Sequence, residues 1–531
     1  MTTILILGAG IMQIPGIELA RRKGWRVIVA DGNPNALGKS LCDRFEVMDL
    51  KDRDGLLELA RSCKQRGLDG VFTAGTDFSS SVAWVAENMG LPGISFQTSL
   101  RATDKCLMRE AFQAAGVPSP RFACWTGEGD PRTTLSAIGF PLVVKPVDNM
   151  GARGVRRVDS EPELLAACRA ALPLSRSSRV IIEQYMEGPE LSLDAVVYRG
   201  TVTVCGVADR HIFFPPSFVE MGHTMPTALD EATVRGIEDV FRAGIKAIGI
   251  DNGAAKGDIK LTPAGPMVGE IAARLSGGYM SGWTFPLSSG VEVTDAALNI
   301  AVGLPPGDLA PRMKRVVAER ALISIPGKVA AVEGEEQARR SGGIAEVFLR
   351  TAAGDTVVFP ANNVEKCGNV IAVADTRSGA DDAAREALSR LRIRLEPLRE
   401  ETNRFLFREK GNDAFASLGP DLDRALEAMP AWRGNPSCLG ADAPVPVLVL
   451  PGFERVTARD WHGLLFPTAV REALDGTGVL TRHPAEQGPF VLGGLFWRAL
   501  LRGSAQGGRY LLESVREARR AGAVVELLRS L

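Results

Sequence analysis

Short apolar runs separated by helical patterns open the chain. TILILGAG ends in a glycine turn, a helical stretch continues to Arg22, and RVIVAD forms a second apolar run. Further apolar segments at Phe45 to Met48 and Val71 to Ala74 are separated by helical patterns. Strands that alternate with helices predict an open parallel sheet, so the first part of the chain is expected to be a Rossmann-like α/β domain.

The middle of the chain consists of apolar runs joined by short turns. PLVVKPV, RVIIEQY and ELSLDAVV are typical of strands, and GDIKLTPAGPMVGEIAARLSGG predicts two strands around a turn near Ala264. Before them, TDKCLMREAFQAAG predicts a capped helix with Lys105 in its first turn. The pattern therefore remains α/β but changes from parallel crossovers to hairpins.

The segment beyond about Glu409 has a pattern of its own. It is rich in proline and glycine around Arg433 to Gly452 and ends in an amphipathic helical stretch with apolar residues on or near one face: Leu511, Leu512, Val515, Ala518 and Val525. These residues could form the core of a small helical domain, or a surface that docks a protein or a carrier-bound substrate. The sequence leaves both interpretations open.

Composition narrows the classes of protein that fit. A chain of 531 residues predicts three or four domains, and 62 basic against 63 acidic residues gives no indication of a nucleic-acid partner. The eight cysteines are scattered without a CxxC pair, which argues against a zinc cluster or a disulfide framework and suits a reducing cytoplasm. No apolar run approaches the roughly 20 residues that span a bilayer, and no secretory leader is evident.

The first glycine turn resembles a dinucleotide fingerprint only in part. Gly8-Ala9-Gly10 is followed by Asp31 at a suitable distance, but Gln13 takes the place of the third glycine. NAD(P) binding and a purely structural turn are the alternatives. Asp77, after the strand near Ala74, could contact a substrate at the end of the sheet or cap the helix that follows.

Several basic residues stand where an anion would explain them. Lys105, at a helix N-terminus, opposes the helix dipole unless it reaches a negative group, and Lys145 lies within an apolar strand, where it requires a counter-charge. The loop DNMGARGV follows directly, with Gly151 and Gly154 free to turn backbone N–H groups toward an anion and Arg153 to add charge. Together these features predict a phosphate site.

Paired carboxylates complete the pattern. Asp258 and Glu270 lie on opposite arms of the predicted hairpin, where side chains of one face can meet and bind Mg²⁺. Arg274, followed by Ser276-Gly277-Gly278, could neutralise a transferring phosphoryl or acyl-phosphate group. Glu183 and Glu190 flank a Gly-Pro connection, where carboxylates can accept from adenine or ribose or simply lie in solvent.

The order of these motifs resembles the ATP-grasp superfamily over roughly residues 1 to 400. The resemblance implies a site for ATP and Mg²⁺, with Mn²⁺ as an alternative ion. It implies that Lys105 and Lys145 bind the phosphates under the glycine loop. Adenine would be bound by Glu183 with the backbone from Gln184 through Tyr185 to Met186, and ribose by Glu190. Asp258 and Glu270 would bind the metal. Residues from about 312 to 395, with GKVAAVEG and GNVIAVADTRSG, look like the C-terminal β-rich domain of biotin carboxylase and its relatives.

One departure indicates the branch of the family. Many members have asparagine two positions after the second metal carboxylate, but Ala272 stands there. The form EIAAR-x-SGG, with Gly222-His223 and Pro226 upstream, is closer to the L-amino acid ligases. That resemblance implies that Arg274 holds a carboxylate as it becomes an acyl phosphate. His223 could face the same site or have a structural role.

The resulting expectation is an enzyme of four domains: a Rossmann-like domain at residues 1–100, an ATP-grasp domain at 101–310, a biotin carboxylase-like C-terminal domain at 311–408 and an appended, mostly helical domain at 409–531. The expected reaction joins a small-molecule carboxylate to an amine through an acyl phosphate and releases ADP and phosphate. The alternative is an ATP-dependent carboxylase or another enzyme that forms an acyl phosphate. A cytoplasmic location, a homodimer, and no nucleic-acid or membrane partner complete the expectation.

Overall fold

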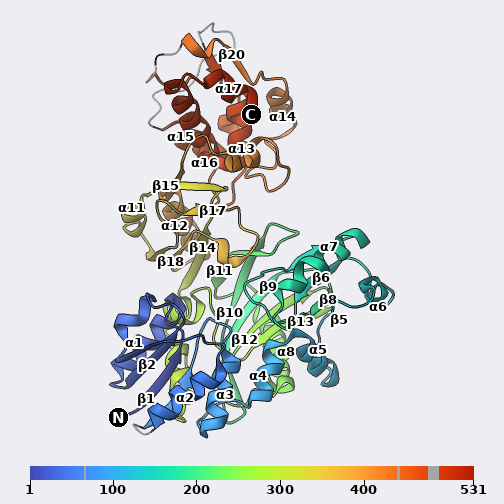
Figure 1. The fold of residues 1–531 in the computed structure, drawn as a ribbon, viewed down its shortest axis with the longest axis vertical. Helices are drawn as coiled ribbons and strands as arrows, with labels where there is room; N and C mark the ends of the chain where they lie inside the picture. The colour runs from blue at the N-terminus through green and yellow to red at the C-terminus, as the bar shows by residue number, and fades with distance from the viewer. Residues whose placement is uncertain (65–66, 439, 441–442, 476–489) are drawn as a thin grey trace. The chain divides into compact units, whose positions relative to one another are not determined.

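The computed structural model describes residues 1–64, 67–438, 440, 443–475 and 490–531 (Figure 1). The chain divides into two compact units. The first comprises residues 1–319 with 373–380, and the second comprises residues 320–372 with 381–531. Each unit is described separately.

The first unit begins with a four-stranded parallel sheet in the order β3-β2-β1-β4. Alternate residues of β1 enter different cores: Ile4 and Ile6 pack on one face, and Leu5 and Leu7 pack on the other. Both faces of a parallel sheet are covered, which explains the uninterrupted apolar run. The predicted Rossmann-like domain is confirmed. Its strands are β1 (Thr3–Leu7), β2 (Arg26–Asp31), β3 (Arg44–Val47) and β4 (Leu68–Phe72), and its helices are α1 (Ile14–Arg22), α2 (Arg53–Lys64) and α3 (Ser79–Met89).

A second four-stranded sheet follows, with the order β5-β8-β6-β7 and antiparallel pairing between all neighbours. Helix α7 (Glu161–Ala171) packs on it through Leu164 and Cys168. The strands are β5 (Phe122–Trp125), β6 (Leu142–Pro146), β7 (Arg156–Val158) and β8 (Val180–Gln184).

The third sheet of this unit is antiparallel from β13 through β12, β9 and β10 to β11. Phe112 and Phe241, from two of the covering helices, are fully buried against it. A Cβ atom on Gly257 would lie 2.4 Å from the Phe241 ring, so only glycine fits under this helix. The strands are β9 (Glu190–Tyr198), β10 (Thr201–Phe213), β11 (Val219–Met225), β12 (Gly253–Thr262) and β13 (Gly265–Ala272), and the helices are α4 (Phe96–Thr103), α5 (Lys105–Ala114) and α8 (Glu231–Ile248).

After β13 the chain makes a short helical turn at Met280–Thr284 and then forms α9 (Phe285–Ser289) and α10 (Val293–Ala301). Helix α10 packs against α1 and β4, so the end of this segment returns to the Rossmann-like sheet. The chain passes from the first unit to the second within β14 (Val316–Leu322).

The second unit has one continuous hydrophobic core that extends from Leu322 to Leu528. At its centre Trp497 is 2% exposed and contacts the rings of Phe453, Phe466 and Phe496. The amphipathic end of the chain packs into this core, which supports the core interpretation of the tail. Its strands include β15 (Gly327–Glu333), β16 (Ile344–Leu349), β17 (Thr356–Val357), β18 (Gly368–Ala374) and β19 (Arg392–Leu395), and its helices include α12 (Arg377–Arg390), α13 (Glu400–Phe407), α14 (Pro420–Glu427), α15 (Phe466–Leu474), α16 (Gly494–Arg520) and α17 (Val524–Ser530).

Two sequence expectations concern features of the whole chain. The scattered cysteines argued against a disulfide framework, but one disulfide is present, between Cys106 at the start of α5 and Cys124 on β5. Packing of α5 beside β5 brings these residues together, and a separation of 18 residues gives no local signal of it. Among the described residues, no helix is long and apolar enough to cross a membrane.

Candidate active site

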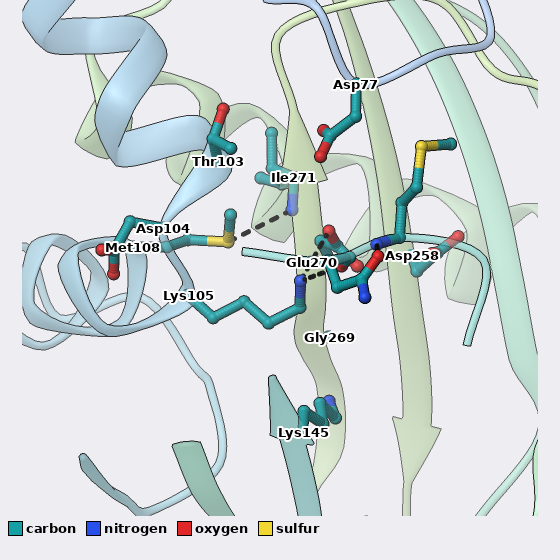
Figure 2. Close-up of polar contacts among 12 residues, drawn as sticks. Asp77, Thr103, Asp104, Lys105, Met108, Lys145, Asp258, Gly269, Glu270 and Ile271 are labelled. Carbon is teal, nitrogen blue, oxygen red and sulfur yellow. Dashed lines mark hydrogen bonds and ion pairs between the residues drawn. The ribbon is translucent and has the colours of Figure 1, made fainter. Parts of the chain in front are cut away.

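Asp258 and Glu270 face each other across the hairpin formed by β12 and β13. They are direct partners in strand register, which confirms the predicted hairpin. Figure 2 shows the ammonium group of Lys105 pointing toward Glu270. The Nζ atom of Lys105 lies 3.5 Å from Oε1 of Glu270 and donates a hydrogen bond of 2.9 Å to the carbonyl of Asn149. The lysine at the helix N-terminus thus reaches an anionic group, as its unfavourable placement indicated.

Positive charge gathers around Glu270. Burial alone would raise the pKa of this carboxyl group, but the charges of Lys105, Lys256 and Lys145, followed by that of Arg274, lower the pKa to about 2. Glu270 is therefore an anion throughout the neutral range.

Arg210 connects three acidic residues that are distant in sequence. Its guanidinium lies 3.0 Å from Asp258 and 2.7 Å from Glu220, and it also pairs with Glu190. Burial would lower the pKa of Arg210, but these carboxylates raise it further above its usual value. Arg210 thus holds both Glu190, the expected ribose ligand, and Asp258, one of the expected metal ligands.

Glu183 is fully buried between two cations. It accepts from Arg109 Nε at 2.7 Å and lies 2.6 Å from Lys145 Nζ. Burial raises the pKa of this carboxyl group, but Arg109 and Lys145 outweigh that effect and lower it. In this structure the carboxylate is engaged by two cations, and the adenine contact expected for the Glu183 side chain stays a prediction. Glu183 forms an ion pair with Lys145 in this structure. The counter-charge that Lys145 requires is therefore supplied by the protein itself.

The glycine loop lies between β6 and β7. Gly151 and Gly154 both have φ of 71°, in the left-handed region that favours glycine. A Cβ atom on Gly154 would lie 2.7 Å from Leu174, so the position also requires the smallest side chain. Arg153 donates to the carbonyl of Met150 at 3.0 Å and forms no ion pair with any described acidic residue.

The connection between β8 and β9 contains the residues expected to contact adenine. The backbone N–H of Tyr185 is taken by the carbonyl of Pro141, and that of Gln184 by the carbonyl of Arg121. The Tyr185 ring lies 4.6 Å from the Arg157 guanidinium. Met186 has no described intramolecular partner for its backbone N–H, which leaves this donor open to a ligand.

The turn after β13 is fixed from beneath by Asp194. This fully buried residue of β9 accepts hydrogen bonds from the backbone N–H and the hydroxyl of Ser276, each at 2.9 Å, while its second oxygen has no hydrogen-bond partner. Burial raises the pKa of Asp194 to about 7, although Ser276, Lys256 and Arg274 oppose the shift. Arg274 donates to the carbonyl of Leu275 at 3.0 Å, and its buried Nε has no partner.

His223 is fully buried on β11. Its Nε2 lies 3.0 Å from the Thr284 hydroxyl, and its Nδ1 lies 3.3 Å from Glu319. These contacts tie β11 to the helical turn that follows the Ser276 segment. They agree with a structural role, and a catalytic role stays a prediction.

The loop after β4 approaches the same turn. Gly75 donates its N–H to the carbonyl of Leu275 at 3.3 Å, and Ala74 pairs with Leu275 as an isolated bridge. Asp77, two residues further, lies 4.0 Å from Arg176, and Figure 2 draws its carboxylate directed toward the ends of β12 and β13. The end of the Rossmann-like sheet therefore adjoins the Arg274 turn.

The side chain of Gln13 fills the glycine turn that resembled a dinucleotide site. Its Oε1 accepts from Gly10 N–H at 3.0 Å, and its Nε2 donates to the carbonyl of Ala74. Asp31 in turn accepts from Ala9 N–H at 2.6 Å. The donors that would bind a pyrophosphate are thus occupied by the protein itself, which contradicts the NAD(P) alternative.

Sequence reasoning missed three residues of this centre: Arg109, Asp194 and Arg210. Asp194 interrupts an otherwise apolar stretch, the signal that also identified Lys145, so the sequence alone could have marked it as a buried charge. Arg109 is followed by Glu110, and Arg210 stands between Asp209 and His211, so neither had that signal.

Comparisons with known proteins agree with this geometry. Residues 138–282 match the family model of the ATP-grasp domain, and residues 320–396 match that of the L-amino acid ligase C-terminal domain 2. The chain is 28% identical over 393 residues to the uncharacterized protein y4rH of Sinorhizobium fredii, an alignment that covers 72% of this chain and 80% of that one.

Human carnosine synthase 1 is 27% identical over 331 residues, which cover 57% of this chain and only 40% of the relative's length. The crystal structure of an L-amino acid ligase from Bacillus licheniformis superposes with a TM-score of 0.66 at 23% identity, over 75% of this chain and 99% of that structure. At this identity the superposition shows a common fold.

Proposed function

We propose, from the premise that this chain belongs to the ATP-grasp superfamily, that it is an ATP-dependent ligase that joins a small-molecule carboxylate to an amine. The proposed reaction passes through an acyl phosphate and releases ADP and phosphate. One observation supports it most directly: among the cations of the centre, Arg274 and Arg153 are the two without an acidic partner in the described part of the chain, so both are available to an anionic ligand.

The remaining cations help to define the proposed nucleotide site. Lys105 and Lys145 are held by Glu270 and Glu183, so their ammonium groups are already oriented when phosphates arrive. The loop from Gly151 to Gly154 would cover the phosphates. The open N–H of Met186 is suited to an adenine ring nitrogen, and Glu190 to ribose hydroxyls.

Asp258 and Glu270 fit a divalent cation. Both oxygens of Asp258 face cations of the protein: Oδ1 lies 3.0 Å from Arg210, and Oδ2 pairs with Lys256, so the group is held as the anion that a metal ligand must be. Within the described ranges, no cluster of three or more His, Cys, Asp or Glu side chains could hold a metal alone. Two carboxylates nevertheless suit Mg²⁺, which usually takes its other ligands from phosphates and water. When bound, the ion would neutralise charge on the phosphates.

The chemistry needs no protein nucleophile. An oxygen of the substrate carboxylate attacks the γ-phosphorus of ATP, ADP leaves, and the acyl phosphate forms. The amine nitrogen then attacks the carbonyl carbon, phosphate leaves, and the nitrogen loses a proton. Arg274 would hold the carboxylate and then the acyl phosphate through its planar fork, with its turn fixed by Asp194 beneath Ser276.

Ala272 favours ligation over carboxylation. It stands where carboxylases of this superfamily have asparagine, so the polar group of those enzymes is replaced by a buried methyl group. Bicarbonate is the substrate that distinguishes the two reactions.

The test is a screen of phosphate release by the full chain with ATP, Mg²⁺ and pairs of acids and amines, including free amino acids, in bicarbonate-depleted buffer. We expect ADP formation that depends on both acid and amine. Hydroxylamine in place of the amine should trap the acyl phosphate as a hydroxamate. ADP formation that requires bicarbonate would overturn the ligase proposal, and amide formation without a trappable hydroxamate would overturn the acyl phosphate.

A further inference from the structure

A cavity lies inside the second unit, and none of the residues that line it belongs to the candidate active site. The space open to water centres is about 80 Å³, several times the roughly 15 Å³ that one water needs. Strand β19, the end of α12 and Ile323 form one wall. Helices α15 and α16 and the loop from Asp460 to Leu464 form the other. The cavity therefore has the size of a small organic molecule of about five non-hydrogen atoms.

Two charged groups on the walls have no partner of opposite charge. The Arg509 guanidinium donates only to the backbone carbonyl of Glu472, and no described acidic side chain lies within ion-pair distance of it. The carboxyl group of Glu472 accepts no described hydrogen bond and forms no described ion pair. By contrast, Arg394, on the wall formed by β19, lies between Glu333 at 3.0 Å and Glu513 at 3.2 Å.

The electrostatics of this pair agree with their isolation. Burial raises the pKa of Glu472 to about 7, against the opposing charges of Arg392 and Arg509. Burial also lowers the pKa of Arg509 and the charge of nearby Arg392 adds to the shift, while the more distant carboxylates of Glu513, Asp475 and Glu333 oppose it. Both charged forms would be stabilised by a ligand that brought the missing opposite charges.

The wall around these groups is held in an unusual conformation. Helix α16 breaks its regular geometry at Gly503 and Ser504, where Ser504 has φ of 52° and ψ of −151°. The Ser504 hydroxyl donates to Asp460 at 2.5 Å, and Asp460 also accepts from the N–H of His462. His462 Nε2 accepts from Ile323 N–H at 3.1 Å, so the neutral ring has its proton on Nδ1. Strain in a residue other than glycine, held by a hydrogen-bond network, is typical of binding sites.

We propose that this cavity binds a small free α-amino acid, with its carboxylate on Arg509 and its ammonium group on Glu472. An α-amino acid has both charges a few ångströms apart and matches the size of the space. An inorganic anion would satisfy Arg509 but face the Glu472 carboxylate, and a simple amine would satisfy Glu472 but face Arg509 and Arg392. The site would be separate from the proposed catalytic centre and does not depend on the proposed reaction.

Calorimetry and thermal-shift measurements on the full chain without ATP test this proposal. Glycine and L-alanine should bind saturably and raise the Tm. Acetate, ethylamine and inorganic phosphate at the same concentrations should not. If phosphate or acetate reproduces the effect, or neither amino acid binds, the assignment of an amino acid is overturned.

Three variants locate the binding. Glu472→Gln and Arg509→Gln should each weaken glycine and alanine binding at least tenfold. Arg498→Gln removes an exposed arginine from the same helix and should bind as the parent does. Arg274→Lys should also retain this binding, because Arg274 belongs to the proposed catalytic centre. Parental affinity in Glu472→Gln, which changes the least volume, would overturn the proposal even if Arg509→Gln fails to fold.

Discussion

Asp194 and Ser276 are joined by two hydrogen bonds across 82 residues of sequence. The same carboxylate oxygen accepts from the backbone N–H and from the hydroxyl of Ser276, each at 2.9 Å. Both residues are buried, and the other oxygen of Asp194 has no hydrogen-bond partner. The turn that positions Arg274 is thus fixed to the central strand β9 by a group that is costly to ionise.

Asp194→Asn should therefore change the pH dependence of stability. The folded pKa of about 7 lies above the usual aspartate pKa of 3.8, so the folded state binds more protons between these values. The associated stability is fully present below about pH 4 and is lost as the pH rises through 7. Asparagine retains the acceptor oxygen without the charge. The variant should gain a few degrees of Tm over the parent at pH 8.5 and much less at pH 4.5.

The matched control for this change is Asp239→Asn, which neutralises an aspartate with a 77% exposed side chain on α8. Its Tm difference from the parent should stay nearly constant with pH. If Asp194→Asn also shows a constant difference, the buried carboxylate does not titrate near neutrality in the folded protein.

Glu270→Gln should leave the fold intact but remove one charge from the proposed metal site. We expect the affinity for Mg²⁺ to fall roughly 10- to 100-fold, as for other losses of metal-site partners, and phosphate release to fall with it. The measurement is the Mg²⁺ dependence of ADP formation. Asp251→Asn, an exposed position just before β12, is the control and should retain the parental curve. An unchanged Mg²⁺ dependence in Glu270→Gln would remove this residue from the metal site.

Arg274→Lys keeps the positive charge but loses the planar fork that can hold a carboxylate through two hydrogen bonds. ATP affinity should survive, while substrate-dependent ADP formation should fall on the order of 100-fold or more. Nucleotide binding and ADP formation would be measured with and without the acid substrate. If ATP affinity falls as far as ADP formation does, Arg274 is a ligand of the nucleotide and not of the acid substrate.

Substitutions of Lys145 and of its partner Glu183 should affect ATP affinity and stability in opposite ways. Lys145→Met should raise the Kd for ATP by about tenfold or more but lower the Tm little, because Arg109 still pairs with Glu183. Glu183→Gln leaves the fully buried Arg109 without its counter-charge and should cost about 3–5 kcal/mol of stability. Glu187→Gln, at an exposed position four residues later, is the control for stability. A stable Glu183→Gln would contradict the paired-charge account.

Local patterns predicted the elements of this centre well. The turn after Thr262 and the cap at Asp104 depend on neighbouring residues, so the hairpin with Asp258 and Glu270 and the helix with Lys105 could be predicted from sequence. Lys145 could be identified because a lysine interrupts an apolar strand. In each case the signal lies within a few residues of its effect.

Contacts between distant elements could not be predicted in the same way. The sequence indicated that Lys145 needs a counter-charge, but a phosphate and a buried glutamate satisfy that need equally well. Only the pairing of β6 with β8 brings Glu183 to it. Arg210 likewise meets Asp258 and Glu190 because β9 lies between β10 and β12.

The amide of Gln13 has a consequence for any attempt to engineer cofactor binding into the Rossmann-like sheet. Because this side chain already caps Gly10 N–H and bridges to Ala74, it acts as an internal substitute for a ligand. Replacing Gln13 with glycine would open the turn but also release Ala74, which precedes the Gly75 contact with the Arg274 turn. Space for a cofactor would therefore be gained only by loosening the contact between the Rossmann-like sheet and the turn that carries Arg274.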